Sequence, residues 1–243
     1  MSEGQMSETS QAEIAARFSG IHDWVFDLDN TLYPHHIDLH TQIGARMTDY
    51  VSSLLGLAPE EAWTLQRQYY LDHGLTLLGL MADHGIDPLD YLEKTHAIDY
   101  SALQPQPGLA AALAALPGRK FIFTNASRGH ADAVATALGL SGLFDGVFDL
   151  VAAGYAPKPT ADSYRKFLEG MGVDAHSAAM FEDLPRNLDV PHSLGMVTVL
   201  IIPSAQEKVP IWWDSQSTAT ARADFVTDDL AGFLAAIVGT SQT

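Results

Sequence analysis

The chain has 243 residues, of which 47% are hydrophobic, and its formal net charge at pH 7 is −17. This size and composition suit a folded protein with a sizeable core and argue against global disorder. The acidic balance makes nucleic acid an unexpected partner, because phosphate backbones are bound by clustered Lys and Arg. A small phosphorylated substrate is still compatible with it, because a bound divalent cation reverses the local field.

Cysteine is absent, which excludes disulfides, thiolate metal sites and cysteine nucleophiles together. The polar N-terminus is unlike a signal peptide, and the densest apolar run, Met196 to Ile202, is too short to span a bilayer. We therefore expect a cytoplasmic protein that has no membrane partner and is a monomer or a homodimer.

Residues 1–19 are expected to form a flexible N-terminal tail, with at most a short helix from Ala12 to Phe18. A buried strand follows from His22 to Leu28, where an apolar run stops at acidic residues. In residues 34–104 the apolar residues recur at helical spacing and no strand pattern occurs. This stretch is expected to be an all-helical domain inserted after the first strand.

After Pro105 the pattern alternates between short apolar runs and helical segments. The later strands are predicted at 120–123, 147–151, 178–181, 196–202 and 225–226, and the helices at 109–116, 128–138, 160–171, 184–194 and 230–238. Pro191 is expected to kink the helix at 184–194. The alternation predicts an α/β fold with a doubly wound, mainly parallel, Rossmann-like sheet. Residues 20–33 and 105–243 would form this core.

Polar side chains collect where the predicted strands end. They are Asp27 and Asp29 after the first strand, Thr124 and Asn125 after the second, and Glu182 and Asp183 after the fourth. Ligands of open α/β sheets bind outside the carboxyl ends of the strands, so these side chains are expected to meet at one edge. Lys158, between two prolines in a loop before a helix, can point at the same edge.

These residue types predict phosphoryl transfer to an aspartate, followed by hydrolysis. An oxygen-only acidic cluster suits Mg²⁺, and a carboxylate beside a cation can attack phosphorus to form an acyl phosphate. An EF-hand does not fit, because the required Gly and closing Glu are absent. Thr124, Asn125 and the amide of Ala126 at a helix start can bind phosphate oxygens. Lys158 would offset the negative charge of the transferring group.

Four motifs occur in order, and through them residues 22–238 resemble the haloacid dehalogenase-like (HAD) superfamily. The motifs are Asp27-Leu28-Asp29-Asn30-Thr31, Phe123-Thr124-Asn125, Lys158 and Glu182-Asp183. The resemblance implies that Asp27 is the nucleophile and Asp29 the general acid and base. It also implies that Thr124 and Asn125 contact phosphate, while Lys158 steadies the nucleophile and the phosphoryl group.

The resemblance further implies a Mg²⁺ site and a cap domain. The metal would be held by Asp27, the main-chain carbonyl of Asp29, and Asp183, with Glu182 adjacent or acting through water. The helical insertion would correspond to the helical cap of the superfamily. An acid at the position of Asp29 is typical of its phosphatases, whereas its dehalogenases lack that acid and need no metal.

A narrower resemblance is to the pyrimidine 5′-nucleotidase group. It rests on the runs Asp27 to Tyr33, Tyr69-Tyr70, His73 to Leu80 and Arg119 to Asn125. It implies a nucleoside monophosphate such as UMP or CMP as substrate, with Ca²⁺ expected to inhibit. The alternatives are a sugar-phosphate or phosphoglycolate phosphatase, a phosphomutase, and a non-catalytic binding protein on this fold.

Other polar residues near the motifs have less specific interpretations. His35, His36 and His40 are interpreted as solvated residues at the start of the insertion rather than as a metal site. Asn187 is expected to orient Lys158 or a metal ligand. Arg128 and Arg186 are interpreted as surface residues, and Trp212-Trp213 as a packing anchor or dimer contact.

Overall fold

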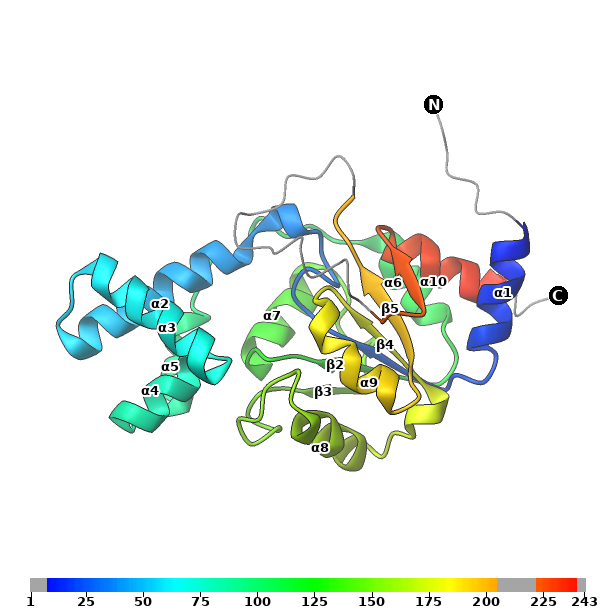
Figure 1. The fold of residues 1–243 in the computed structure, drawn as a ribbon. Helices are drawn as coiled ribbons and strands as arrows, with labels where there is room; N and C mark the ends of the chain where they lie inside the picture. The colour runs from blue at the N-terminus through cyan, green and yellow to red at the C-terminus, as the bar shows by residue number, and fades with distance from the viewer. Residues whose placement is uncertain (1–7, 205–221, 240–243) are drawn as a thin grey trace.

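A single parallel sheet organises the protein, whose computed structural model describes residues 8–204 and 222–239 (Figure 1). The strands are β1 (Asp23–Phe26), β2 (Arg119–Phe123), β3 (Gly146–Phe148), β4 (Ala178–Glu182), β5 (Val197–Ile201) and β6 (Phe225–Thr227). Their order is β3-β2-β1-β4-β5-β6, and every neighbouring pair is parallel. The chain winds one way from β1 to β3 and the other way from β4 onward, which confirms the predicted doubly wound sheet.

Helices precede, connect and follow these strands. They are α1 (Glu8–Phe18), α2 (Leu39–Leu55), α3 (Pro59–His73), α4 (Thr76–His84), α5 (Pro88–Thr95), α6 (Pro107–Ala115), α7 (Arg128–Ala137), α8 (Ala161–Met171), α9 (Asp189–Ser193) and α10 (Leu230–Gly239), with short 3₁₀ turns η1 (His35–Ile37), η2 (Ala175–Ser177) and η3 (Pro185–Asn187). Among the described residues, no helix is long and apolar enough to cross a membrane.

Alternate side chains of β1 pack into two separate cores. Trp24 and Phe26 lie in one core with residues of α6, α7 and α10, whereas Val25 lies in a second core with residues of α8. This follows from the two-residue repeat of a strand, in which successive side chains point to opposite faces. Because both faces are buried, the residues of β1 from Trp24 to Phe26 are all apolar, as is typical of a strand at the centre of a parallel sheet.

The register of the central strands brings the predicted site residues together. Phe26, the last residue of β1, pairs with Ile122 on one side and with Phe181 on the other. The strands therefore reach the same edge within one or two residues of each other. Asp27 emerges at this edge beside the end of β4, at the boundary where the winding of the sheet reverses.

The helices α2 to α5 form a block beside the sheet, and residues 34–104 contain no strand (Figure 1). They have a core of their own, which includes Val51, Tyr69, Leu80 and Tyr91. A side chain at Gly79 would collide with the Tyr69 ring, so this glycine permits the close approach of α3 and α4. We call α2 to α5 the helical block.

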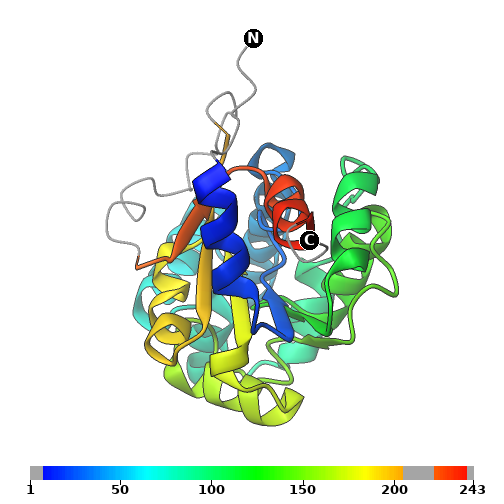
Figure 2. The same cartoon turned by 90° about the vertical axis from the view of Figure 1, so that its right-hand side faces the viewer.

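The short helix predicted from Ala12 to Phe18 is confirmed, although it begins four residues earlier, and the predicted flexible tail is wrong for residues 8–18. These residues form α1, in which Ile14 and Phe18 are buried. The Phe18 ring lies 5.9 Å from that of Trp24 and 5.8 Å from that of Phe233. Figure 2 shows α1 alongside α10, which it contacts. Two well-placed apolar side chains thus fix a segment that is otherwise polar. Residues 1–7 and the pair Trp212-Trp213 lie outside the described residues.

The predicted kinked helix at 184–194 is also wrong. The segment is divided into η3 and the short helix α9, which begins at Asp189. Pro191 therefore lies in the first turn of α9, where the missing N–H of proline costs no helical hydrogen bond. The helical segment is interrupted before Pro191, between η3 and α9, so the proline does not bend a continuous helix.

Candidate active site

Lys158 lies at the centre of the site. Its Nζ is 2.6 Å from Asp27 Oδ1, 2.6 Å from Glu182 Oε2 and 2.9 Å from the carbonyl oxygen of Phe123. A lysine ammonium has three protons to donate, and this arrangement uses all of them. The side chains of Lys158, Asp27 and Glu182 are buried, so water does little to screen their charges. The network therefore fixes the orientation of the Asp27 carboxylate.

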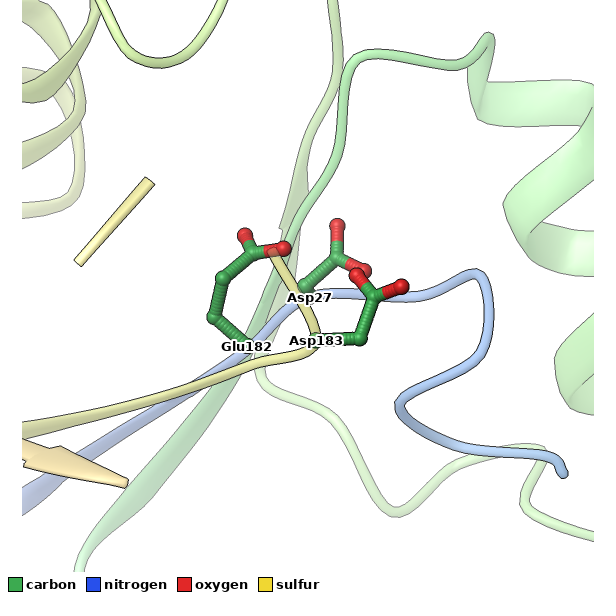
Figure 3. A group of neighbouring side chains, drawn as sticks. All are labelled: Asp27, Glu182 and Asp183. Atoms are coloured by element: carbon green, nitrogen blue, oxygen red, sulfur yellow. The ribbon is translucent and has the colours of Figure 1, made fainter. Parts of the chain in front are cut away.

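Asp27, Glu182 and Asp183 form a buried acidic cluster between the ends of β1 and β4. Each offers a carboxylate oxygen, and these oxygens lie within 4.8 Å of one another. Figure 3 shows the three carboxylates gathered together, with Asp27 following β1 and the other two at the end of β4. The structure thus brings together three acids that the sequence predicts as metal ligands.

The cluster carries more negative charge than Lys158 offsets. Burial, followed by the charge of Glu182, raises the pKa of Asp27 to about 7 although Lys158 acts in the opposite direction. Burial also raises the pKa of Glu182 to about 7, again against the effect of Lys158. The pKa of Asp183 is raised as well, chiefly by burial. A divalent cation would relieve this repulsion.

The donors present fit a hard cation such as Mg²⁺. They are all oxygens, with no sulfur or imidazole in the cluster. Asn30 adds an independent observation: its amide nitrogen donates to Asp183 Oδ2 at 3.3 Å, and its buried Oδ1 has no partner among the described residues. A metal-bound water is a donor that would satisfy this oxygen.

Asp29 has a different set of partners. Tyr33 donates a hydrogen bond to Asp29 Oδ1 at 2.6 Å, and His130 Nε2 lies 2.8 Å from the same oxygen. Burial acts to raise the pKa of Asp29, but His130, His40 and Tyr33 together outweigh it and hold that pKa well below its ordinary value. Two acids that are two residues apart in the sequence therefore occupy different electrostatic environments.

His130 is itself held by residues that follow α5. The Tyr100 hydroxyl lies 2.9 Å from His130 Nδ1 and donates to the carbonyl oxygen of His96 at 3.0 Å. The His96 ring stacks on the His130 ring with centroids 4.7 Å apart, and burial lowers the pKa of His96 to about 4. Sequence reasoning missed this group, because Asp29 and His130 are 101 residues apart and no spacing rule connects them.

The loop after β2 positions Lys158 as well as offering phosphate ligands. Asn125 Nδ2 donates to the carbonyl oxygen of Lys158 at 3.1 Å, and Asn125 Oδ1 accepts from the Lys158 amide at 2.8 Å. One amide proton of Asn125 is left for a phosphate oxygen. The amide of Ala126 already donates to Thr124 Oγ1 at 3.0 Å, and would exchange that bond to bind phosphate. The predicted phosphate contacts stay predictions.

The interpretation of the early histidines as solvated is wrong for His35. This side chain is 1% exposed, and its Nε2 lies 3.6 Å from Asp183 Oδ2. It is also wrong for His40, which is partly buried and whose pKa is lowered by burial. His36 is exposed, as predicted. The turn η1 follows the Asp27 loop directly and therefore folds His35 against the cluster.

The remaining polar candidates are less central. Asn187 is buried, but its predicted role in orienting Lys158 or a metal ligand stays a prediction. Arg128 pairs with Asp132 at 2.9 Å on the surface. Arg186 does more than the sequence indicates: its guanidinium donates to the Tyr70 hydroxyl and lies 5.7 Å from the Tyr70 ring centroid. This contact joins η3, beside the acidic cluster, to α3 of the helical block.

A family model described as haloacid dehalogenase-like hydrolase matches residues 25–194. Phosphate metabolism protein 8 of Saccharomyces cerevisiae is 31% identical over an alignment of 134 residues, and the match covers 50% of this chain and 41% of the yeast protein. The match thus spans less than half of that relative's length.

Two solved structures share the fold. CbbY from Rhodobacter sphaeroides, in complex with phosphate, has a TM-score of 0.55 and 20% identity, over 89% of this chain and 99% of that chain. L-2-haloacid dehalogenase from Xanthobacter autotrophicus has a TM-score of 0.53 and 19% identity, over 90% of this chain and 99% of that chain. At these identities the likeness concerns the architecture alone.

Proposed function

The chain belongs to the haloacid dehalogenase-like hydrolases, and we propose that it is a Mg²⁺-dependent phosphatase acting on a small phosphate monoester through an aspartyl phosphate. The observation that carries the proposal is the separation of two acids. Asp27 shares Lys158 with Glu182, whereas Asp29 is held by Tyr33 and His130. One carboxylate is suited to attack phosphorus and the other to move a proton.

In the first step an oxygen of Asp27 attacks phosphorus, and the bond between phosphorus and the ester oxygen breaks. The leaving oxygen takes a proton from Asp29. Asp29 must take up a proton before this step, and the negative charge of a bound phosphoryl group favours that uptake because it raises the pKa of Asp29. Lys158 orients the Asp27 carboxylate and favours its ionised form.

In the second step a water molecule attacks the phosphorus of the aspartyl phosphate. Asp29 accepts the proton of this water, and the bond between phosphorus and Asp27 breaks. Inorganic phosphate leaves, the Asp27 carboxylate is restored, and Asp29 is protonated again. The same carboxyl group therefore acts first as an acid and then as a base.

Asp27, Asp183 and the main-chain carbonyl of Asp29 would hold Mg²⁺. When bound, the cation supplies positive charge that offsets the charge of the phosphoryl oxygens. Glu182 would act through water or through Lys158, because its Oε2 contacts Lys158 and its Oε1 accepts from the Leu184 amide at 3.2 Å. Thr124 and Asn125 would bind the phosphoryl oxygens.

The proposed substrate is a pyrimidine nucleoside 5′-monophosphate, and residues 34–104 are the proposed cap. The two segments that connect the helical block to the core support the proposed cap, because of where they lie. Tyr33 lies in the first and Tyr100 in the second, and both side chains reach the Asp29 site. A cap moving on these segments would exclude water during the first step and admit it for the second.

A screen of phosphate esters with Mg²⁺ tests the proposal. We expect release of inorganic phosphate by the wild type, fastest from UMP or CMP, and at least about 10²-fold slower release by Asp27→Asn. Faster release from a sugar phosphate or phosphoglycolate would contradict the nucleotide assignment alone. Equal and very slow release by both proteins from every ester would contradict the phosphatase itself.

A further inference from the structure

We propose that His130 is a positioning residue that fixes the Asp29 carboxylate, so that one of its oxygens faces the leaving group of the substrate. The inference rests on the proposed phosphatase function and goes beyond it. None of the sequence motifs contains His130, which lies in the first turn of α7.

The hydrogen bonds from Tyr33 and His130 converge on one oxygen of the Asp29 carboxylate. Both residues bind Oδ1, at 2.6 Å and 2.8 Å. The Asp29 side chain is 15% exposed, whereas that of His130 is completely buried. Oδ1 is thus the oxygen anchored by Tyr33 and His130, and we assign proton exchange with substrate to the other oxygen, Oδ2.

The His130 ring is held in one orientation. The Tyr100 hydroxyl has a single proton, which it donates to the carbonyl oxygen of His96, so its oxygen faces His130 Nδ1 as an acceptor. The His96 ring covers one face of the His130 ring. With Nδ1 and one face fixed, Nε2 can point only toward Asp29. Three residues thus define where a single carboxylate points.

This arrangement makes the position of Asp29 depend on both connections of the helical block. Tyr33 lies in the segment before α2 and binds Asp29 directly, whereas Tyr100 lies in the segment after α5 and acts through His130. Proton transfer requires donor and acceptor to be aligned closely, and a displacement of about 1 Å can cost about 10²-fold in rate. His130 would therefore matter most where protonation of the leaving group matters most.

A buried histidine can also be purely structural, and the two roles differ in how the rate depends on the leaving group. Loss of a structural residue slows the reaction of all esters alike. Loss of a residue that positions a general acid slows esters with a basic leaving group more, because a stable anion can leave without a proton. The ratio of kcat/KM for phenyl phosphate and 4-nitrophenyl phosphate measures this dependence, since kcat/KM reports on the step in which the ester oxygen leaves.

The test compares His130→Ala, His130→Gln and Tyr100→Phe with the wild type on these two esters, with Mg²⁺. We expect His130→Ala to lose about 10- to 100-fold more kcat/KM with phenyl phosphate than with 4-nitrophenyl phosphate. His130→Gln, which can still offer an N–H, should recover part of the difference. Tyr100→Phe removes only a hydroxyl and should show a smaller selective loss even if His130→Ala does not fold. His22→Ala, at the opposite edge of the sheet, is the matched control and should behave as the wild type.

Equal losses with both esters in His130→Ala and Tyr100→Phe would overturn the positioning role, as would unchanged kinetics in both. The proposed function is judged separately, by whether the wild type hydrolyses either ester and Asp27→Asn does not. A phosphatase without a selective His130 effect would leave the function standing and remove this inference.

Discussion

Lys158 Nζ lies 2.6 Å from Asp27 Oδ1, and both side chains are buried at the end of β1. A buried lysine with no partner would tend to lose its charge, but Asp27 and Glu182 oppose the effect of burial and raise the pKa of Lys158 above its ordinary value. The ammonium group is therefore a fixed positive charge beside the proposed nucleophile.

Replacing Lys158 should impair both stability and catalysis. Lys158→Met leaves two buried carboxylates uncompensated, and we expect the free energy of unfolding in a chelator to fall by about 3–5 kcal/mol. Phosphate release should fall by at least about 10²-fold. Lys158→Arg keeps the charge and should lose less of both. Chemical denaturation and a phosphate assay measure the effects, and a fully active Lys158→Met would contradict the assigned role.

The acidic cluster predicts how the stability of the metal-free protein depends on pH. The pKa of Asp27 and of Glu182 is about 7 in the folded chain, against ordinary values of 3.8 and 4.5. The folded state thus binds these protons more tightly than the unfolded state does. Their contribution to stability is complete below about pH 4 and is lost as the pH rises through about 7.

In a chelator, the unfolding temperature of the wild type should therefore fall relative to that of Asp27→Asn between about pH 5 and about pH 8. Asp27→Asn has one such acid fewer and serves as the reference. Mg²⁺ should remove the relative fall, because the cation binds the ionised acids. If the difference in unfolding temperature between the wild type and Asp27→Asn stays the same across this pH range, the acids of the cluster do not repel one another as assigned.

Removing one proposed metal ligand should abolish the response to Mg²⁺. Asp183→Asn is expected to release phosphate at least about 10²-fold more slowly and to bind Mg²⁺ at least about 10-fold more weakly. Ca²⁺ should not replace Mg²⁺, because it accepts looser coordination. Asp228→Asn, an exposed acid after β6, is the control. Calorimetric titration with Mg²⁺ checks the binding, and equal affinity in Asp183→Asn and the wild type would refute the ligand role.

The contact between Arg186 and Tyr70 should influence the helical block rather than the chemical step. Tyr70→Ala removes a hydrogen bond and a partly exposed cation–π contact of about 0.5–1 kcal/mol. If the block closes over substrate, KM should rise about two- to five-fold while kcat changes little. Steady-state kinetics decide this, with Tyr70→Phe retaining the ring contact as a control. A fall in kcat at constant KM would argue against this view.

The helix α1 should be needed for stability. Phe18→Ala removes a buried ring that packs against Trp24, Phe181 and Phe233. The expected loss is about 3–5 kcal/mol of unfolding free energy, measured by denaturant titration. A loss below about 1 kcal/mol would show that the segment is dispensable, as the prediction of a flexible tail implied.

These cases show what the sequence could and could not reveal. The strand before Asp27 and the alternation after Pro105 were predictable, because apolar periodicity is a local property. The packing of Phe18 was not, since a single aromatic residue in a polar segment shows no period. Pro191 in an apparently continuous helix predicts a kink, because the sequence does not show that η3 ends before it and that α9 begins at Asp189.

The residues of the candidate site likewise fall into a predictable group and an unpredictable one. The acids and Lys158 lie at strand ends or on a stiff loop, so topology brings them to one edge. His130 and Tyr100 reach Asp29 from distant segments, and His35 is buried only because η1 folds back on Asp183. Such contacts depend on tertiary packing, which the pattern of one sequence does not contain.

Detection of the covalent intermediate tests the central claim most directly. Asp29→Asn retains the nucleophile but lacks the base of the second step, so an aspartyl phosphate should accumulate with Mg²⁺ and 4-nitrophenyl phosphate. Borohydride reduction of this acyl phosphate converts the aspartate to homoserine, which mass spectrometry of the peptides can locate. We predict homoserine at position 27 and none in the double variant Asp27→Asn, Asp29→Asn. Homoserine at another aspartate, or none in a variant that still releases 4-nitrophenol, would contradict the assignment of Asp27 as the nucleophile.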